Sequence, residues 1–150
     1  MESILVSSCL LGINCRYNGG HNQNEALMSG MAQFNLIPVC PEQLGGLPTP
    51  RLPCEIRFEE GERRVFDINQ EDRTDLFVKG AEETLKIAKL LGITKAILKQ
   101  NSPSCGSRYC YDGSFSKILI PAMGITAQLL DKHQVALFDE DTWHGIVDTD

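Results

Sequence analysis

Cysteines are the residues of this 150-residue chain with the most distinctive chemistry, and three of the six share one kind of setting. Cys9, Cys40 and Cys105 each follow a short aliphatic run, at separations of 31 and 65 residues. That spacing is not the CxxC pattern of a zinc finger. A shared site therefore depends on the fold bringing the three thiols together. The alternative is that each is buried separately as a small apolar residue.

Glycine and proline gather around these cysteines. Cys40 opens CPEQLGGLPTPR, residues 40–51, and Cys105 lies within SPSCG, residues 102–106. Glycine and proline at this density fix unusual backbone geometry and let main-chain N–H groups approach a sulfur atom or an anion closely. A cysteine that is merely buried does not require such a setting, so the pattern favours a shared site.

Three converging thiolates suit more than one kind of chemistry. A structural zinc ion takes four ligands, and His21 is the candidate for the fourth, although a lone loop histidine is more often solvated. A cubane iron–sulfur cluster held by three thiolates leaves one iron without a protein ligand. Two further interpretations stay open: a zinc module that fixes loops for a partner, and a hydrolase or redox enzyme with Cys105 as nucleophile. The second lacks an obvious histidine partner.

The elements that must position these residues follow from hydrophobic periodicity. Four aliphatic runs predict buried strands, at residues 4–8, 36–40, 95–99 and 135–139. Amphipathic segments between them predict three helices, one behind an Asn24 cap, one over residues 74–91 and one over residues 125–133. The alternation indicates a parallel sheet with right-handed crossovers. We therefore expect a three-layer α/β/α fold with a small parallel sheet, Rossmann-like or flavodoxin-like.

The connections indicate where function should lie. The length suits one domain over residues 1–150, with a short hairpin at residues 55–68 that turns at Gly61 and a loosely packed tail at residues 141–150. The segments after the first three strands each run well past ten residues. Open α/β sheets bind ligands outside the carboxyl ends of their strands, where the strand order reverses. We expect the site at that edge.

Composition narrows the class of protein. The net charge of −6 and the absence of a basic run argue against a large nucleic-acid surface. No stretch approaches the roughly 18 apolar residues of a membrane span, and the first residues lack an export signal. A cytoplasmic location is therefore expected, and in a reducing compartment the cysteines favour catalysis or metal binding over disulfides. The sequence does not indicate an oligomeric state.

Several motifs together resemble a known family. They are VSSCLLGINCRYNGG, VCPEQLGGLPTPRLPCEI, FVKGAEETLKIAK, LKQNSPSCG, YDGSF and GITAQLL, in this order along nearly the whole chain. The series is similar to the thiouracil desulfurase family in its stand-alone form. The resemblance implies a 4Fe-4S cluster that removes sulfur from 2-thiouracil without net redox change, giving uracil and hydrogen sulfide. The ligands it implies are Cys9, Cys40 and Cys105.

The remaining thiols fall outside this ligand set. Cys15 is interpreted as an alternate or transient ligand or, more simply, as part of a glycine-rich turn. Cys54 and Cys110 lie outside the motif positions and are interpreted as structural residues.

Polar residues near the cysteines supply candidates for the remaining roles. Glu42, two residues after Cys40, is the carboxylate best placed to activate water, and its alternative role is to pair with Arg51. Ser102 and Ser104 are candidates to orient the water or the pyrimidine, or only to cap the turn. Ser8 and Arg51 are candidate substrate contacts. The expected substrate is a small thiolated pyrimidine.

Overall fold

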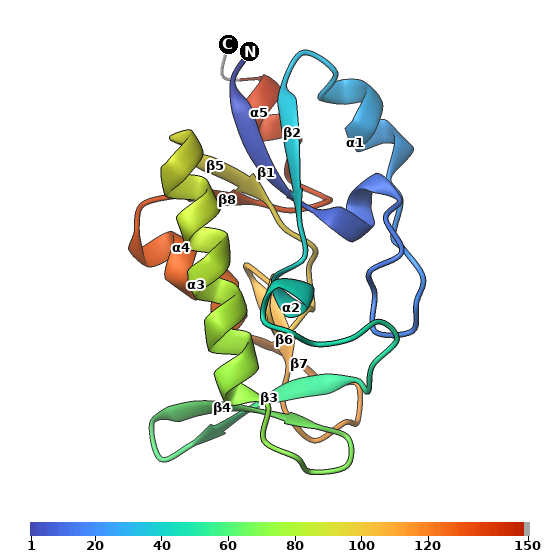
Figure 1. Ribbon diagram of the computed structural model, residues 1–150, viewed down its shortest axis with the longest axis vertical. Helices are drawn as coiled ribbons and strands as arrows, with labels where there is room; N and C mark the ends of the chain where they lie inside the picture. Colours follow the sequence, from blue (N-terminus) through green and yellow to red (C-terminus); the bar gives the residue numbers. More distant parts are fainter. Residues whose placement is uncertain (149–150) are drawn as a thin grey trace.

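The computed structural model describes residues 1–148, which contain a four-stranded parallel sheet in the order β2-β1-β5-β8 (Figure 1). The strands are β1 (Ser3–Ser7), β2 (Asn35–Val39), β5 (Lys95–Ile97) and β8 (Ala136–Phe138). In register, Ile4 lies opposite Leu36, and Ala96 lies opposite both Leu5 and Leu137. The four predicted strands are confirmed: β1 and β2 have the predicted length but begin one residue earlier, and β5 and β8 are two residues shorter than predicted. The strand order reverses between β1 and β5, as in flavodoxin-like sheets.

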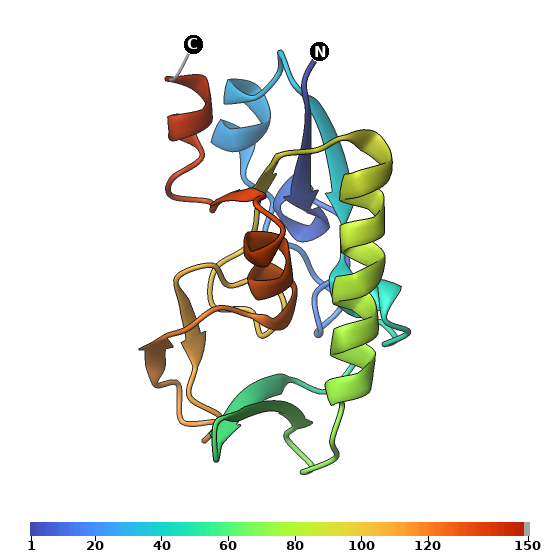
Figure 2. The ribbon, with the colours of Figure 1, turned by 90° about the vertical axis from the view of Figure 1, so that its left-hand side faces the viewer.

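Helices cover both faces of this sheet, which confirms the three-layer α/β/α prediction (Figure 2). On one face, α1 (Glu25–Gly30) and α5 (His144–Val147) pack with Ile4 and Val6. On the other, α3 (Thr74–Leu91) and α4 (Ile125–Lys132) pack with Leu5. The division follows from the alternation of side chains along β1. The predicted Asn24 cap is present, because its Oδ1 accepts a hydrogen bond of 3.0 Å from the Leu27 N–H.

Helix α3 has the bounds that its periodicity predicts. Phe77, Ala81 and Ala88 form its buried stripe, and Gly92 ends it in the left-handed conformation with φ of 65°. The short helix α2 (Pro41–Leu44) crosses α3 in backbone contact. A Cβ atom on Gly80 would lie 1.9 Å from the Pro41 carbonyl oxygen, so only glycine permits this approach. The contact fixes the segment that begins at Cys40.

Two antiparallel hairpins stand beyond the carboxyl ends of the sheet strands. The first pairs β3 (Cys54–Glu59) with β4 (Glu62–Asp67) and turns through Gly61, as predicted. The second pairs β6 (Tyr109–Tyr111) with β7 (Leu119–Pro121) and was not predicted from the sequence. In Figure 1 both hairpins lie at the end of the molecule away from the N-terminus, where the sheet strands end.

The prediction of a loosely packed tail is wrong for the described part of residues 141–148. Trp143 and Ile146 are 5% and 1% exposed and belong to the core around β1. Gly30 of α1 makes room for the indole, since a Cβ there would lie 2.2 Å from a ring carbon. Residues 149 and 150, the last of the predicted tail, lie outside the described residues. No helix within residues 1–148 is long and apolar enough to cross a membrane.

Candidate functional site

A cavity of about 420 Å³ lies between the carboxyl ends of β1, β2 and β5 and the two hairpins. Five of the six cysteines line it: Cys9, Cys15, Cys40, Cys54 and Cys105. All six cysteines of the chain are free thiols. The structure thus brings the three cysteines singled out by sequence to one cavity, at the sheet edge where a ligand site was expected.

Each of the three predicted cysteines follows the end of a strand, and each lies in a different local structure. Cys9 lies in the 3-10 helix η1 (Ser8–Leu11), which follows β1 directly. Cys40 is the N-cap residue of α2, immediately after β2. Cys105 lies in the loop after β5, where the Ser102 Oγ accepts hydrogen bonds from the N–H groups of Ser104 at 3.1 Å and Cys105 at 3.0 Å. That serine turn sets the position of the third thiol.

Cys15 joins the site, beside Cys9 and Cys40. It is 3% exposed, and its thiol is hydrogen bonded to both neighbouring thiols. Hydrogen bonding with the Cys15 thiol lowers the pKa of Cys9 to about 7 and the pKa of Cys40 to about 6, while the pKa of Cys15 itself rises. Thiolates, rather than thiols, bind metals. Two of the three candidate ligands are therefore close to the ionised state at neutral pH.

Cys105 has the opposite electrostatic setting. Its burial raises the pKa to about 12, although hydrogen bonds from Ser7 and Ser104 partly oppose this effect. The Ser104 hydroxyl lies 3.7 Å from its sulfur. A buried thiol with a high pKa is a poor nucleophile unless a metal or base takes its proton. No histidine of the described chain lines the cavity to act as that base.

A chain of hydrogen bonds joins the candidate polar residues across the cavity. The hydroxyls of Ser102 and Ser104 lie 2.9 Å apart, and Ser104 donates to Glu42 Oε2 at 2.8 Å. Arg51 Nε pairs with Glu42 Oε1 at 3.0 Å, with side-chain exposures of 5% and 14%. Arg51 Nη2 also donates to the Cys15 carbonyl oxygen at 2.8 Å. Glu42 is thus held between the loop of Cys105 and the loop of Cys15.

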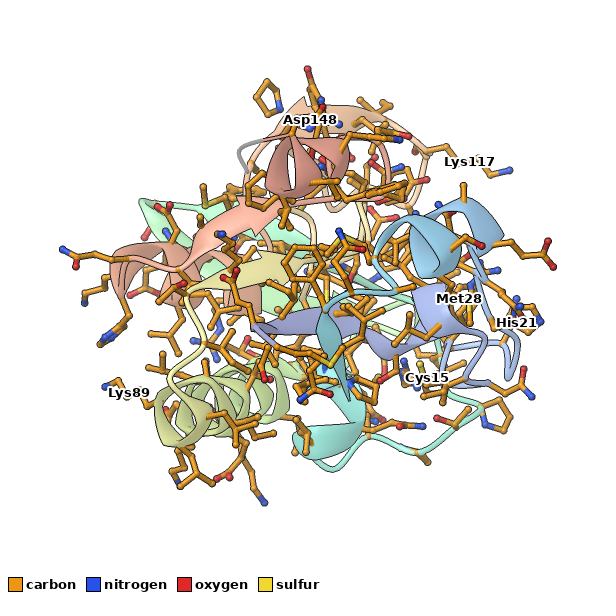
Figure 3. All side chains as sticks on the ribbon, turned by 90° about the horizontal axis from the view of Figure 1, so that it is seen from above. Cys15, His21, Met28, Lys89, Lys117 and Asp148 are labelled. Atoms are coloured by element: carbon orange, nitrogen blue, oxygen red, sulfur yellow. The ribbon has the colours of Figure 1, made fainter. Side chains whose placement is uncertain are left out.

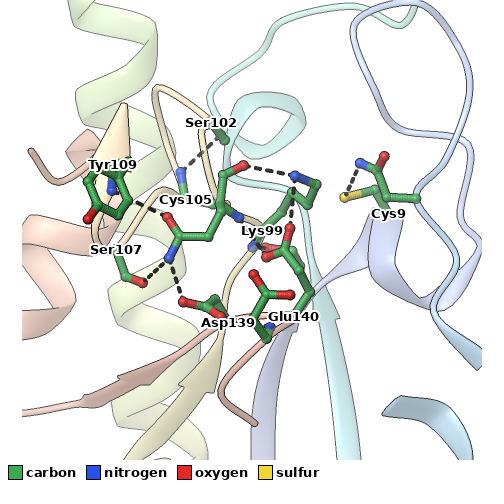
Figure 4. Close-up of polar contacts among 12 residues, drawn as sticks. Cys9, Lys99, Ser102, Cys105, Ser107, Tyr109, Asp139 and Glu140 are labelled. Atoms are coloured by element: carbon green, nitrogen blue, oxygen red, sulfur yellow. Dashed lines mark hydrogen bonds and ion pairs between the residues drawn. The ribbon is translucent and has the colours of Figure 1, made fainter. Parts of the chain in front are cut away.

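Two further residues lie at the site: Asn22, which sequence reasoning did not single out, and Lys99, one of four basic residues expected beside these loops to favour the negative charge of the thiolates. Asn22 Nδ2 donates to the Cys9 sulfur at 3.4 Å (Figure 4). Lys99 Nζ lies 2.9 Å from Glu140 Oε2 and 3.0 Å from the Gln100 carbonyl oxygen, and it faces the cavity. Its position two residues after the end of β5 is a usable sequence signal, because polar residues just beyond the carboxyl ends of parallel strands lie at the ligand edge. No comparable periodic signal marks Asn22.

Behind the cavity, a buried network fixes the loop that carries Cys105. Asp139, 1% exposed, accepts hydrogen bonds from Gln100 Nε2 and, at 2.8 Å, from Arg108 Nε. The Gln100 side-chain oxygen accepts from the Tyr109 N–H at 3.3 Å, and its Nε2 also donates to Ser107. Figure 4 shows this network beside Cys105 and Lys99. The loop is therefore tied to the end of β8 at several points.

The other sequence candidates divide between the cavity and the rest of the molecule. Ser8 is buried and lines the cavity. Cys54 also lines it, and burial raises its pKa to about 12. Cys110 is buried in a separate apolar cluster. His21 is exposed, accepts a hydrogen bond from the Gln23 N–H at 3.0 Å, and lies at the rim of the molecule while Cys15 lies further in (Figure 3).

The spacing of the donors bears on what they can hold. Among residues 1–148, no three His, Cys, Asp or Glu side chains lie close enough together to bind a single metal ion. Zinc needs such a convergence, because its ligands all lie about 2.0–2.3 Å from one centre. An iron–sulfur cluster is larger and is reached by thiolates that are farther apart. The described residues 1–148 thus contain no preformed set of donors for a single zinc ion.

Three comparisons with known proteins each found a match over most of the chain. The family model described as 2-thiouracil desulfurase matches residues 4–142. The YbbK protein of Bacillus subtilis strain 168 is 41% identical over 150 residues, covering 96% of this chain and 99% of YbbK. A solved structure titled [4Fe-4S]-dependent thiouracil desulfidase TudS superposes with a TM-score of 0.89 at 38% identity, covering 99% of this chain and 97% of that one.

Proposed function

This chain belongs to the 2-thiouracil desulfurase family, and on that premise we propose that it removes the sulfur of 2-thiouracil or a related thiolated pyrimidine, using a 4Fe-4S cluster. The proposed products are the carbonyl compound, uracil for 2-thiouracil, and hydrogen sulfide. The observation that carries this proposal is the meeting of Cys9, Cys40 and Cys105 in one cavity that also contains Glu42. The cavity of about 420 Å³ falls within the size range of small-molecule sites.

The residues present fit a three-thiolate cluster, and we propose Cys9, Cys40 and Cys105 as its ligands. Two have pKa values of about 7 and 6, and the Asn22 amide supplies a hydrogen bond of the kind that stabilises a coordinated sulfur. When bound, such a cluster supplies an iron without a protein ligand, a soft Lewis acid that prefers a thiocarbonyl sulfur to oxygen donors. Lys99, a cation at the cavity, stabilises the negative charge of the thiolate ligands.

Glu42 is the proposed base. Water adds to the ring carbon of the C=S group while Glu42 takes one of its protons, and the C–S bond then breaks as the carbonyl forms. Both protons of the water end on the departing sulfur, one returned by Glu42 and the other lost from the added hydroxyl as the carbonyl forms, so that one water and one thiocarbonyl give one carbonyl and one hydrogen sulfide without electron transfer. Ser104, which donates to Glu42 at 2.8 Å, and Ser102, beside it, orient the carboxylate and the water.

Arg51 and Ser8 receive different roles in this proposal. Arg51 donates to Glu42, Pro48, Thr49 and Cys15, which favours a positioning role for its guanidinium over the direct substrate contact expected from sequence. Ser8, buried at the cavity, remains the proposed polar contact to the pyrimidine.

The two rival functions have less support. A zinc module requires a closer set of donors than residues 1–148 contain. A nucleophilic Cys105 requires a low pKa or a neighbouring base, whereas burial raises its pKa to about 12. The six free thiols agree with the reducing compartment expected from sequence, so a cytoplasmic location stays part of the proposal. So does a single domain over residues 1–150, of which the family model covers 4–142.

Anaerobic reconstitution tests the proposed function. The purified chain is loaded with iron and sulfide, and 2-thiouracil is added in ¹⁸O-labelled water without any reductant. We expect visible absorption, equal amounts of sulfide and uracil, and ¹⁸O in the new carbonyl. The matched control is the same preparation stripped of iron by a chelator. Equal activity of the stripped protein, or a strict need for a reductant, would contradict the proposal.

A further inference from the structure

The segment Tyr-Asp-Gly-Ser-Phe, residues 111–115, belongs to the motif series but has no role in the mechanism above. It forms the end of β6 and the start of the loop to β7. Three side chains from this hairpin line the cavity: Tyr111, Phe115 and Lys117. The hairpin therefore contributes to the same space as the thiols, from a different part of the fold.

The loop of this hairpin is held in one conformation by the neighbouring hairpin. Glu55 of β3 accepts hydrogen bonds on one oxygen, Oε1, from the N–H groups of Gly113 at 3.0 Å and Phe115 at 3.1 Å. Gly113 has φ of 94°, and a Cβ on it would lie 2.6 Å from the Ile56 carbonyl oxygen. The loop thus packs directly on β3, at a point where only glycine fits.

Further contacts within the loop fix Phe115. Asp112 accepts a hydrogen bond from the Ser114 N–H at 2.9 Å, and its own N–H donates to the Ile118 carbonyl oxygen at 2.9 Å. Phe115 itself has φ of 57°, in the left-handed region that a bulky residue rarely adopts. Such conformations persist where the surroundings enforce them, and they concentrate at ligand-binding sites. Here the ring is half-buried at the cavity although its backbone is unfavourable.

The side chains on this side of the cavity suit a flat aromatic ligand. The thiols and Glu42 supply groups that react with a C=S bond, but they offer no surface that fits the face of a ring. Phe115 and Tyr111 supply such a surface, and a nucleobase stacks on an aromatic side chain whatever its edge substituents are. Tyr17, the third aromatic residue of the lining, is 42% exposed and lies under the Arg16 guanidinium. Phe115 is the ring best fixed for this purpose.

We propose that Phe115, held in place by Glu55, is the stacking platform for the pyrimidine ring and the residue that selects cyclic thiolated bases over acyclic thioamides. This inference rests on the proposed function and names how its substrate is recognised. Recognition then lies on the hairpins, whereas bond breaking lies at the sheet edge.

Calorimetric titration of the reconstituted holoprotein with uracil, the sulfur-free product, tests this inference. For Phe115→Leu we expect a dissociation constant for uracil and a KM for 2-thiouracil that rise roughly tenfold, the lower range for loss of one base–aromatic stack. The kcat and the visible spectrum stay unchanged, because neither thiols nor Glu42 are touched. Phe115→Tyr keeps the aromatic face and should bind uracil within about twofold of wild type.

Two further variants guard against a general loss of structure. Phe58→Leu removes an aromatic ring from β3 that is 43% exposed and does not line the cavity, and it should leave uracil binding unchanged. Glu55→Ala removes the acceptor of two loop N–H groups and should weaken uracil binding several-fold while the iron content stays constant. Wild-type uracil binding by Phe115→Leu would overturn the inference.

The outcomes separate this inference from the proposed function. A holoprotein that binds uracil through Phe115 but releases no sulfide from 2-thiouracil contradicts the function and supports the platform. A holoprotein that releases sulfide, with uracil binding unaffected by Phe115→Leu, supports the function and overturns the platform.

Discussion

The two walls of the cavity are built in different ways. The thiol wall consists of Cys9, Cys40 and Cys105 with Glu42, and its members come from segments after three different strands. The hairpin wall consists of Cys54, Glu55, Tyr111, Phe115 and Lys117, which come from two local hairpins and the loop between β6 and β7.

Parallel topology explains the thiol wall, because the carboxyl ends of neighbouring parallel strands meet at one edge whatever their distance in sequence. The hairpin wall needs only short-range pairing. The comparison teaches that reactive groups are fixed by the sheet while the surface facing them is set by loops. Such loops vary more readily than the scaffold that carries them.

The largest expected effect comes from removing a thiol of the thiol wall. Cys9→Ser and Cys40→Ser should each reduce the iron content after reconstitution to near zero, because two thiolates hold a cluster much less well than three. Iron and acid-labile sulfide analysis checks this. A matched substitution on the hairpin wall, Cys54→Ser, should retain iron. Loss of iron from Cys54→Ser alone would reverse the assignment of the two walls.

Next in size is the loss of the proposed base. Glu42→Gln keeps the shape of the side chain but cannot take a proton, and kcat for sulfide release should fall by roughly 10² to 10⁴-fold. The visible spectrum should persist, since Glu42 is not a proposed ligand. Normal turnover by this variant would remove Glu42 from the mechanism. The proposed role of the thiol wall would then be limited to binding the cluster.

A smaller effect is expected for the residue that holds this base. Arg51→Lys preserves the charge but loses the planar fork that reaches both Glu42 and the Cys15 carbonyl oxygen. We expect kcat to fall by roughly 10- to 100-fold through misplacement of the carboxylate. The KM should change little if Arg51 only positions Glu42. A KM effect larger than the kcat effect would restore the substrate contact expected from sequence.

The smallest effect is expected behind the thiol wall. Asp139→Asn should lower the free energy of unfolding by about 1–3 kcal/mol, measured by denaturant titration near neutral pH, because it weakens hydrogen bonds of a buried carboxylate. Burial disfavours ionisation of Asp139, but hydrogen bonds from Gln100, the Asp141 N–H and Arg108 outweigh it and hold the pKa below its usual range.

The sign of the accompanying pH dependence follows from that lowered pKa. Asp139 contributes its full stability above the unfolded-state pKa of about 3.9, and this contribution is lost as pH falls through the lower folded-state pKa. The stability of the wild type should therefore drop more steeply below about pH 4 than that of Asp139→Asn. Equal slopes for the two proteins would contradict this role of the carboxylate.

The two walls also differ in how much of each could be predicted from the sequence. The strand around Ile4, Leu5 and Val6 and the helix over residues 74–91 were predictable, because an aliphatic run and a regular apolar stripe each admit few structures. The convergence of Cys9, Cys40 and Cys105 followed from that fold. Hydrophobic periodicity thus predicted the sheet, and the topology of the sheet predicted that the three thiols meet at its edge.

The rest depends on contacts that leave no periodic pattern. Strands β6 and β7 have three residues each, too few to show alternation, and the loop between them is held by Glu55 from another hairpin. Trp143 was expected in a loosely packed tail, yet it packs beside Gly30, which lies 113 positions earlier. The place of Cys15 between two other thiols arises only from the path of its loop. Such features come from tertiary packing of short segments.

The pair Cys105 and Cys110 provides the most direct test of the central claim, because the two thiols lie five residues apart and only one faces the cavity. The measurement is the iron content per chain of Cys105→Ser and Cys110→Ser after identical anaerobic reconstitution. We predict that Cys105→Ser retains almost no iron and that Cys110→Ser retains the wild-type amount. The opposite result, with iron lost from Cys110→Ser and kept by Cys105→Ser, would contradict a cluster site at the ends of the three parallel strands.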